Sequence, residues 1–265
     1  MSSAWNKIAL RSSSVLIVLC LGLGGHAQNE DDALRVSMNA PGGTARSIGL
    51  ANAFGALGAD GSVISINPAG FGLFRTSELS TTPAFEVNGV KSLYYGTSAS
   101  ETKSRFYIGN MLLALNSPAD QGSNWRSSTF GVAYDRTATH HWKRQAVGDR
   151  VGSSILDDFA SQAAGILPDS LYNALSFTSG LAYDAYGINP NDTLGTTYSP
   201  ALPFGADVQQ VHTIDSRGAN NTTSFFYSAN WMDRLYIGLS VGIVGHRFTR
   251  TTTHSETTLD EAVDL

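Results

Sequence analysis

The stretch LYIGLSVGIVGHRFTR, residues 235–250, alternates between two kinds of side chain. Its odd-numbered positions from Leu235 to Ile243 are all aliphatic, and its even-numbered positions are mostly small or polar. Because successive side chains of a β-strand point to opposite faces of the sheet, this pattern predicts a strand with one apolar face. In a secreted β-sandwich that face would pack on a second sheet, and in the wall of a membrane β-barrel it would contact lipid.

The preceding residues 222–232, TTSFFYSANWM, alternate in the same way. One face carries Phe225, Tyr227, Ala229 and Trp231, and the other is mostly Ser and Asn. Only Asp233 and Arg234 separate the two runs, which predicts a tight antiparallel hairpin. Trp231 and Tyr236 flank this turn, where a membrane barrel would carry its interfacial aromatic residues.

Three further segments are expected to be strands. Residues 127–136 alternate clearly, whereas residues 104–115 are more uniformly apolar and their facing is left open. Residues 77–98 are interpreted as one long irregular strand, bent near Pro83 or Asn88-Gly89, although a hairpin fits equally well. About five antiparallel strands result, and the fold class is all-β.

Residues 1–27 have the features of a secretory signal peptide. Lys7 and Arg11 form the basic region, residues 15–23 form a short apolar core, and Ala27 ends a small-residue cleavage site. Their removal would lower the net charge from −5 to −7 because Lys7 and Arg11 leave. Only 15% of the residues are charged and no basic patch is present, so nucleic acid is not expected as a partner.

The connections between the expected strands differ in length. The link at 117–124 is short, whereas residues 137–221 form a link of 85 residues, as in barrels with long extracellular loops. Within it, Ser154 and Asp157 have the spacing of a capping box and predict a helix. Its larger apolar positions would either line an entry groove for a hydrophobic ligand or pack on the loop itself: Ile155, Phe159 and Ile166.

Residues 28–76 lie between the signal peptide and the first strand. Residues 44–57 are rich in small side chains and predict a helix that Gly58 would cap. The following Asn67-Pro68-Ala69 predicts a kink, because proline lacks an N–H and restricts the residue before it. We hypothesise that this kink holds the segment away from the strands and leaves a path for an apolar ligand.

The block ARSIGLANAFGALGADGSVISINPAG, residues 45–70, resembles the FadL/TodX family of outer-membrane channels for long-chain fatty acids and toluene-type hydrocarbons. The resemblance implies a monomeric antiparallel barrel of about fourteen strands. It also implies a small helical hatch formed by residues 28–76, with Asn67, Pro68 and Ala69 as the hatch or gate residues. Residues 77–265 would then supply part of the barrel, with the loop at 137–221 on the extracellular side.

Five strands are too few for a bacterial barrel, which has an even number of at least about eight. We therefore expect the chain to be the N-terminal portion of a longer barrel, incomplete by itself. The expected location is the outer membrane of a Gram-negative bacterium, with lipid around the wall. The expected function is uptake of hydrophobic small molecules, and the alternative is a structural or secretion-adaptor barrel that binds a protein partner.

An enzyme is the less favoured interpretation. Residues 238–242, GLSVG, match the nucleophile elbow of esterases, but that motif needs a strand-to-helix turn and here lies inside an alternating strand. The histidines, among them His140, His141, His246 and His254, have no acidic or cysteine partner at metal-ligand spacing. Neither a cofactor nor a metal is therefore expected.

Overall fold

The computed structural model describes residues 30–38 and 42–259. The predicted signal peptide lies outside these residues. The chain divides into two compact units, residues 1–40 and 41–265, and each is considered by itself. The described part of the first unit is a short helix, α2 (Glu30–Ser37). This helix falls within the predicted hatch 28–76, of which residues 41–76 belong to the second unit.

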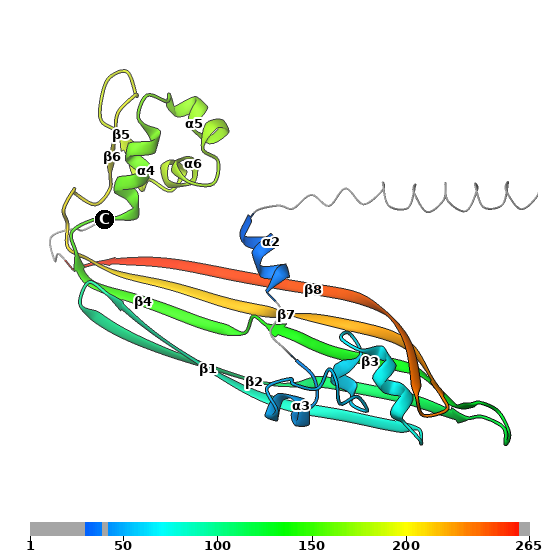
Figure 1. Ribbon diagram of the computed structural model, residues 1–265. Coiled ribbons are helices and arrows are strands. Elements are labelled where there is room, and N and C mark those ends of the chain that lie inside the picture. Colours follow the sequence, from blue (N-terminus) through cyan, green and yellow to red (C-terminus); the bar gives the residue numbers. More distant parts are fainter. Residues whose placement is uncertain (1–29, 39–41, 260–265) are drawn as a thin grey trace, which may run out of the picture. The chain divides into compact units, whose positions relative to one another are not determined.

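The second unit is built on a six-stranded antiparallel sheet of long strands, which run side by side in Figure 1. The strands are β1 (Glu78–Tyr94), β2 (Thr97–Pro118), β3 (Trp125–Thr139), β4 (Trp142–Val151), β7 (Val208–Trp231) and β8 (Leu235–Thr258). Strand β1 pairs with β2, β2 pairs with β3, and β7 pairs with β8. Both β3 and β4 pair with β7, along one side of it. The predicted all-β antiparallel fold is confirmed, and the described sheet is open because β1 and β8 do not pair with each other.

The predicted bounds of the link at 137–221 are wrong at both ends. Strand β3 continues to Thr139, β4 follows after His140 and His141, and β7 begins at Val208 rather than near residue 222. The connection is therefore residues 152–207. These extensions were missed because WKRQAVGDRV and VQQVHTIDSRGANN carry polar residues on both faces, so no apolar alternation marks them.

The single long strand predicted over 77–98 is confirmed as β1, but it ends at Tyr94, and Thr97 and Ser98 already belong to β2. Tyr95 and Gly96 both have positive φ, at 49° and 81°, and form the two-residue turn between β1 and β2. The predicted bend near Pro83 is present as a register shift between Thr82 and Pro83. The predicted hairpin between β7 and β8 is confirmed, with Trp231 paired to Leu235.

Residues 42–76 form short helical pieces rather than one helix. They are α3 (Ala45–Gly49), η1 (Gly61–Val63) and η2 (Pro68–Leu73). The helix predicted over 44–57 stops at Gly49 because Ala51 and Asn52 adopt left-handed backbone angles, with φ of 51° and 60°. Gly58, at a φ of 65°, ends a series of turns instead of capping a helix.

Residues 152–207 fold into three short helices and a small two-stranded sheet. These are α4 (Ile155–Ala163), α5 (Pro168–Ala174), α6 (Ser179–Asp184), β5 (Ile188–Pro190) and β6 (Tyr198–Pro200). The predicted capping box is confirmed: the Ser154 hydroxyl accepts from Leu156 N–H, and the Asp157 carboxylate accepts from Ser154 N–H. Among the described helices, none has the length and apolar character needed to cross a membrane.

Candidate functional site

One face of the sheet is apolar and open, and we name it the apolar face. On β8 it carries Leu235, Ile237, Leu239, Val241 and Ile243, whose side chains are 50–68% exposed. The register continues this face across the neighbouring strands in rows. One such row joins Leu79, Leu113, Val132, Phe225 and Val241. Large apolar side chains in contiguous rows are uncommon on the surface of a soluble monomer and mark an interaction surface.

A bulge keeps β2 in phase with the apolar face. Ile108 pairs with Pro83 and Asn110 pairs with Thr82, which leaves Gly109 as the extra residue. Without it, a strict period of two would place Phe106 and Met111 on opposite faces. Instead the exposed side chains of β2 stay together on both sides of the bulge: Phe106, Ile108, Met111, Leu113 and Leu115. The facing of this segment, left open from the sequence, is thereby resolved.

The opposite face is covered by residues 42–76, and we name it the packed face. Phe54, Val63, Ile64, Phe71 and Phe74 form one buried cluster with side chains of the sheet: Leu112, Ala114, Ala133 and Phe226. The rings of Phe71 and Phe226 lie 4.1 Å apart between centroids. The sheet therefore has its hydrophobic core on one side only, and its other side remains open.

A row of small and polar residues on the packed face holds the backbone of residues 68–74. The register aligns Asn116, Thr129, Ser228 and Gly238 across four strands. Asn116 donates to the carbonyl of Phe74 at 2.8 Å, and the Ser228 hydroxyl donates to the carbonyl of Ala69 at 3.3 Å. We name these four residues the docking row.

Gly238 is the point of closest approach in the docking row. A Cβ atom placed on Gly238 would lie 2.2 Å from the backbone nitrogen of Ala69 and 2.3 Å from the carbonyl carbon of Pro68. The missing N–H of Pro68 also prevents it from competing for strand pairing. The hypothesis that the kink stands away from the strands is therefore wrong, since Pro68 and Ala69 lie directly against β8.

Asn67 ties the kink to its own segment. Its backbone N–H donates to the carbonyl of Val63 at 2.7 Å, and its side-chain amide donates to the carbonyl of Gly55 at 2.9 Å. Asn67 precedes Pro68, the first residue of η2, and has φ −145° and ψ 80°. The three residues selected from the sequence thus lie together, Asn67 bonded within the segment and the other two against the sheet.

A buried carboxylate organises the start of this segment. The hydroxyls of Thr44 and Ser62 donate to Asp60 at 2.8 Å and 2.7 Å, and Arg46 Nε donates to it at 3.2 Å. Burial alone would raise the pKa of Asp60, but the bonds from Ser62 and Thr44 and the charge of Arg46 together hold its pKa below the ordinary 3.8. Asp60 is therefore an ionised anchor that links residues 44–46 to residue 62.

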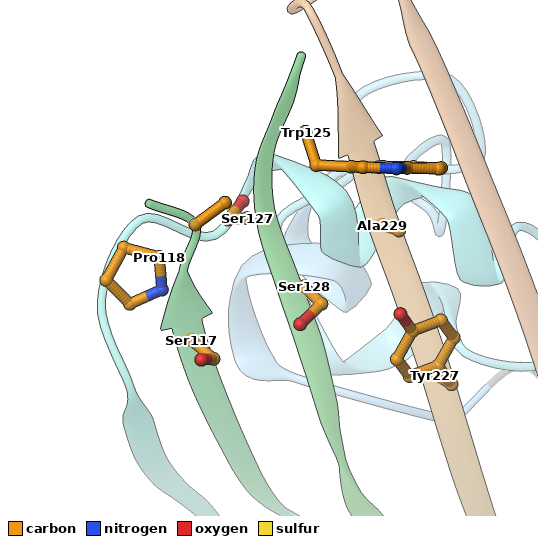
Figure 2. A pocket seen from close by; sticks show the side chains of 8 residues that line it. Ser117, Pro118, Trp125, Ser127, Ser128, Tyr227 and Ala229 are labelled. Atoms are coloured by element: carbon orange, nitrogen blue, oxygen red, sulfur yellow. The ribbon is translucent and has the colours of Figure 1, made fainter. Parts of the chain in front are cut away.

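The end of the sheet near the β2–β3 and β7–β8 turns is aromatic. Trp125 and Trp231 meet edge to face with centroids 4.9 Å apart. Figure 2 shows Trp125 and Tyr227 at a shallow cavity of about 260 Å³, with Ser117 and Pro118 on its other side. Tyr236 flanks the β7–β8 turn as expected, but it pairs with Asn230 and lies on the packed face near Gly72. Tyr236 follows Leu235 directly, so its side chain points to the face opposite the apolar face. The aromatic neighbour of Trp231 is instead Trp125.

The residues proposed as a ligand groove mainly pack on their own loop. Phe159 and Ile166 contact the buried cluster of Ala160, Ala163, Leu171, Ala182, Ile188 and Tyr198. Ile155 is 38% exposed, and its N–H donates to Glu256 at 2.9 Å, which fastens α4 to the end of β8. The structure therefore favours the alternative in which this helix stabilises the loop. Other apolar side chains of the loop are open, above all Phe177 at 90% exposed.

The residues considered for catalysis or metal binding take part in strand pairing and in hydrogen bonds between strands. Ser240 lies inside the continuous strand β8 and pairs with Phe226, so the strand-to-helix turn of a nucleophile elbow is absent there. His140 and His246 both contact the side-chain oxygen of Asn220, at 3.2 Å and 2.5 Å. Within residues 30–38 and 42–259, no group of histidine, cysteine and carboxylate residues is arranged to hold a metal ion.

A cationic cavity was not anticipated from the sequence. Its volume is about 410 Å³, and Arg105, His141, Arg217, Gly218, Arg247 and Thr249 line it. These residues come from β2, from the break between β3 and β4, and from β7 and β8. Such distant segments give no local signal, because only the strand register brings them together.

Comparisons with protein-family models, with characterised proteins and with solved structures gave no match to this chain. The functional argument therefore depends on the two faces of the sheet, the docking row and the cationic cavity.

Proposed function

We propose that the sheet is part of the wall of an outer-membrane β-barrel, and that the apolar face contacts lipid. The observation that carries the proposal is the distribution of side chains: large apolar residues are exposed in rows, and the packed face is mostly small and polar outside the cluster that holds Leu112 and Phe226. This is the reverse of a soluble sheet, which buries its apolar face and exposes its polar face. In a barrel wall, lipid takes the place of the second apolar layer.

The dimensions of the apolar face support the same conclusion. Leu235 to Ile243 span nine residues, about 26 Å along a strand at ~3.3 Å per residue. With the usual tilt of roughly 40°, this becomes about 20 Å of membrane depth, comparable to the apolar band of about 25 Å in known barrels. Trp231 and Trp125 lie at one end of the apolar run, and Arg247 follows it at the other. Such boundaries are typical of membrane interfaces.

Closure of the wall requires partners for β1 and β8. Each has one paired side within the described sheet, and each is long, with 17 and 24 residues. Lipid cannot satisfy the backbone N–H and C=O groups of an open strand edge. We therefore include in the proposal that further strands close the sheet into a barrel, with the packed face turned to the lumen.

In this arrangement residues 42–76 would be the hatch inside the barrel. Support comes from their buried contacts with the packed face, through the Phe71 cluster and the docking row. Passage of a solute would require this segment to move, since Pro68 and Ala69 already contact Gly238. The proposed cargo is a hydrophobic small molecule of the fatty-acid or aromatic-hydrocarbon type, for which the resemblance of residues 45–70 is the support. No catalytic step and no cofactor form part of the proposal.

The alternative is a barrel that binds a protein partner. One observation is compatible with it: residues 152–207 expose large apolar side chains outside the sheet, including Phe177 at 90%, Tyr186 at 78% and Leu194 at 76%. These could receive either a hydrophobic solute or an apolar protein surface. Transport and partner binding would share the same membrane wall and differ at this loop.

The proposed function can be tested in two stages. The full-length protein, with the further strands that close the sheet, is first expressed in Gram-negative cells, and the outer membrane is assayed for a heat-modifiable, protease-resistant barrel. Uptake of radiolabelled oleate and toluene is then compared with cells carrying the empty vector. Membrane insertion with increased uptake supports the channel, and insertion without increased uptake favours the protein-binding alternative. Recovery of the folded protein only in the periplasm would contradict the membrane wall itself.

A further inference from the structure

The cavity lined by Arg105, Arg217 and Arg247 lies where the apolar face becomes polar. On β8 the same face continues from Ile243 through Gly245 to Arg247 and Thr249. Arg217 pairs with Thr249, and Arg247 pairs with Ala219, so the two arginines are diagonal neighbours on adjacent strands. Both arginines therefore line the same cavity, just beyond the last aliphatic position of the apolar face, Ile243.

Strand β2 adds further positive charge to this spot. Arg105 lines the cavity. Lys103, two residues before it, forms an ion pair with Asp215 and donates to the carbonyl of Ser216 at 3.1 Å. The ammonium group of Lys103 thereby ties β2 to β7. Arg105 alternates with Phe106, so it reaches the cavity from the packed-face side of β2, whereas Arg217 and Arg247 reach it from the apolar-face side.

The carboxylates near the cavity do not neutralise it. Asp215 is shared between Lys103 and Arg217. Glu86 is the register partner of Arg105 on β1, and its Oε1 accepts from Asn88 and Thr139. Within the described part of the chain, Arg105 and Arg247 make no ion pair. Four cationic side chains thus face two carboxylates, and the cavity keeps an excess of positive charge suited to an oxyanion.

We propose that this cavity binds the phosphate of a lipid headgroup whose acyl chains lie along the apolar face. The inference goes beyond solute transport and rests only on the membrane location in the proposed function. Arginine recognises phosphate through paired N–H donors, and three guanidinium groups at one spot fit a phosphomonoester well. A lipid is favoured over free phosphate because the nearest aliphatic positions, Ile243 and Val241, are about 13–20 Å along the same strand at ~3.3 Å per residue.

The volume of the cavity is consistent with this ligand. About 410 Å³ is larger than a phosphate ion needs and leaves space for the glycerol or sugar that carries it. The hydroxyl of Thr249 and the ring of His141 line the same cavity and supply hydrogen-bonding groups beyond the charges. The arginine side chains can extend toward the headgroup level while their aliphatic stems stay against the strand.

The test uses the full chain in non-ionic detergent and three probes: dioctanoyl phosphatidic acid, dioctanoylglycerol and inorganic phosphate. Dissociation constants are measured by native mass spectrometry or by ligand-dependent thermal shift. We expect the phosphatidic acid to bind more tightly than either other probe. Arg247→Gln and Arg105→Gln are each expected to weaken it about tenfold, because each removes a charge-assisted bond to phosphate.

Arg144→Gln is the matched control, since it removes the same charge from β4 outside the cavity and should leave binding unchanged. Arg247→Lys keeps the charge but lacks the paired donors, and it should bind more tightly than Arg247→Gln, which separates lost binding from lost folding. Equal affinity for inorganic phosphate and phosphatidic acid would overturn the lipid assignment. Equal affinity of wild type and both glutamine variants would overturn the site. Either failure in a chain that still inserts into membranes leaves the proposed function intact.

Discussion

The backbone nitrogen of Ala69 lies so close to Gly238 that a methyl group on Gly238 would approach it to 2.2 Å. The two residues are far apart in the sequence, with strands β1 to β7 between them. Their contact fixes how residues 68–74 pack against β8. Its neighbour in the docking row, Ser228, donates to the carbonyl of Ala69 at 3.3 Å. The contact therefore links the kink at Pro68 to the packed face, and substitutions at either partner should loosen the segment.

Gly238→Ala should detach residues 68–74 from the packed face, because the added methyl group has no space against a backbone. Overpacking of this kind costs about 1–3 kcal/mol. The measurement is the rate of trypsin cleavage at Arg46 and Arg75, which bracket most of the segment and should become more accessible. Gly242→Ala is the control, since its methyl group would meet side-chain atoms of Thr222 and Ser224 at 3.1 Å and 3.3 Å. Equal cleavage of both variants would contradict the close contact.

The two faces of β8 should respond differently to a lysine. Leu239→Lys places a cation on the apolar face, where lipid contact costs roughly 2–4 kcal/mol near the membrane midplane. Ser240→Lys places it on the packed face, where a lumen would hydrate it. We expect the first variant to lose outer-membrane insertion and the second to retain more of it, measured as the heat-modifiable fraction on gels. Similar losses in both variants would indicate a sheet buried on both faces.

The anchor at Asp60 should make the docking of residues 42–76 dependent on pH. Because the pKa of Asp60 is lower in the folded state than its ordinary 3.8, its contribution is complete above that value and is lost as the pH falls through the lower folded pKa. Asp60→Asn should cost about 1–3 kcal/mol near neutral pH, since buried bonds to a charged group are lost. Thermal unfolding followed between pH 7 and pH 2 measures both effects. An unchanged acid dependence in the variant would show that Asp60 is not the titrating anchor.

Ala69→Trp tests whether the kink region is part of the solute path. An indole at this position would fill space that opens when residues 68–74 move from the docking row. We expect uptake of oleate or toluene to fall while the protein still inserts and resists heat. Ala56→Trp is the control, because Ala56 is exposed in the same segment. Normal uptake by a well-inserted Ala69→Trp protein would remove the gating role and leave the kink as a fold feature.

The sequence predicts those parts of the fold that repeat a local pattern. The aliphatic positions from Leu235 to Ile243, the hairpin between β7 and β8 and the capping box at Ser154 were found in this way. Strand β4 was not, because its charged and polar residues show no apolar period. The bulge at Gly109 could not be located either, because it is defined by the residue opposite on β1.

The candidate sites depend even more on contacts between distant segments. Asn67, Pro68 and Ala69 were selected correctly as a local kink, but their packing against Gly238 follows from the register of β7 and β8. No local sequence pattern connects the arginines at positions 105, 217 and 247, which line one cavity. Phe159 and Ile166 have the helical spacing expected of either a groove or a core, and only the tertiary contacts distinguish the two.

The central claim is that the apolar face contacts lipid, and spin labels placed one at a time along residues 237–243 test it most directly. Cys20 lies in the predicted signal peptide, so a mature chain would carry the introduced cysteine alone. In membranes, labels at Ile237, Leu239 and Val241 should collide often with oxygen and rarely with a water-soluble nickel chelate. Labels at Gly238 and Ser240 should show less contact with oxygen, giving an alternation with a period of two. Equal and high access of the nickel chelate at all of these positions would contradict the account.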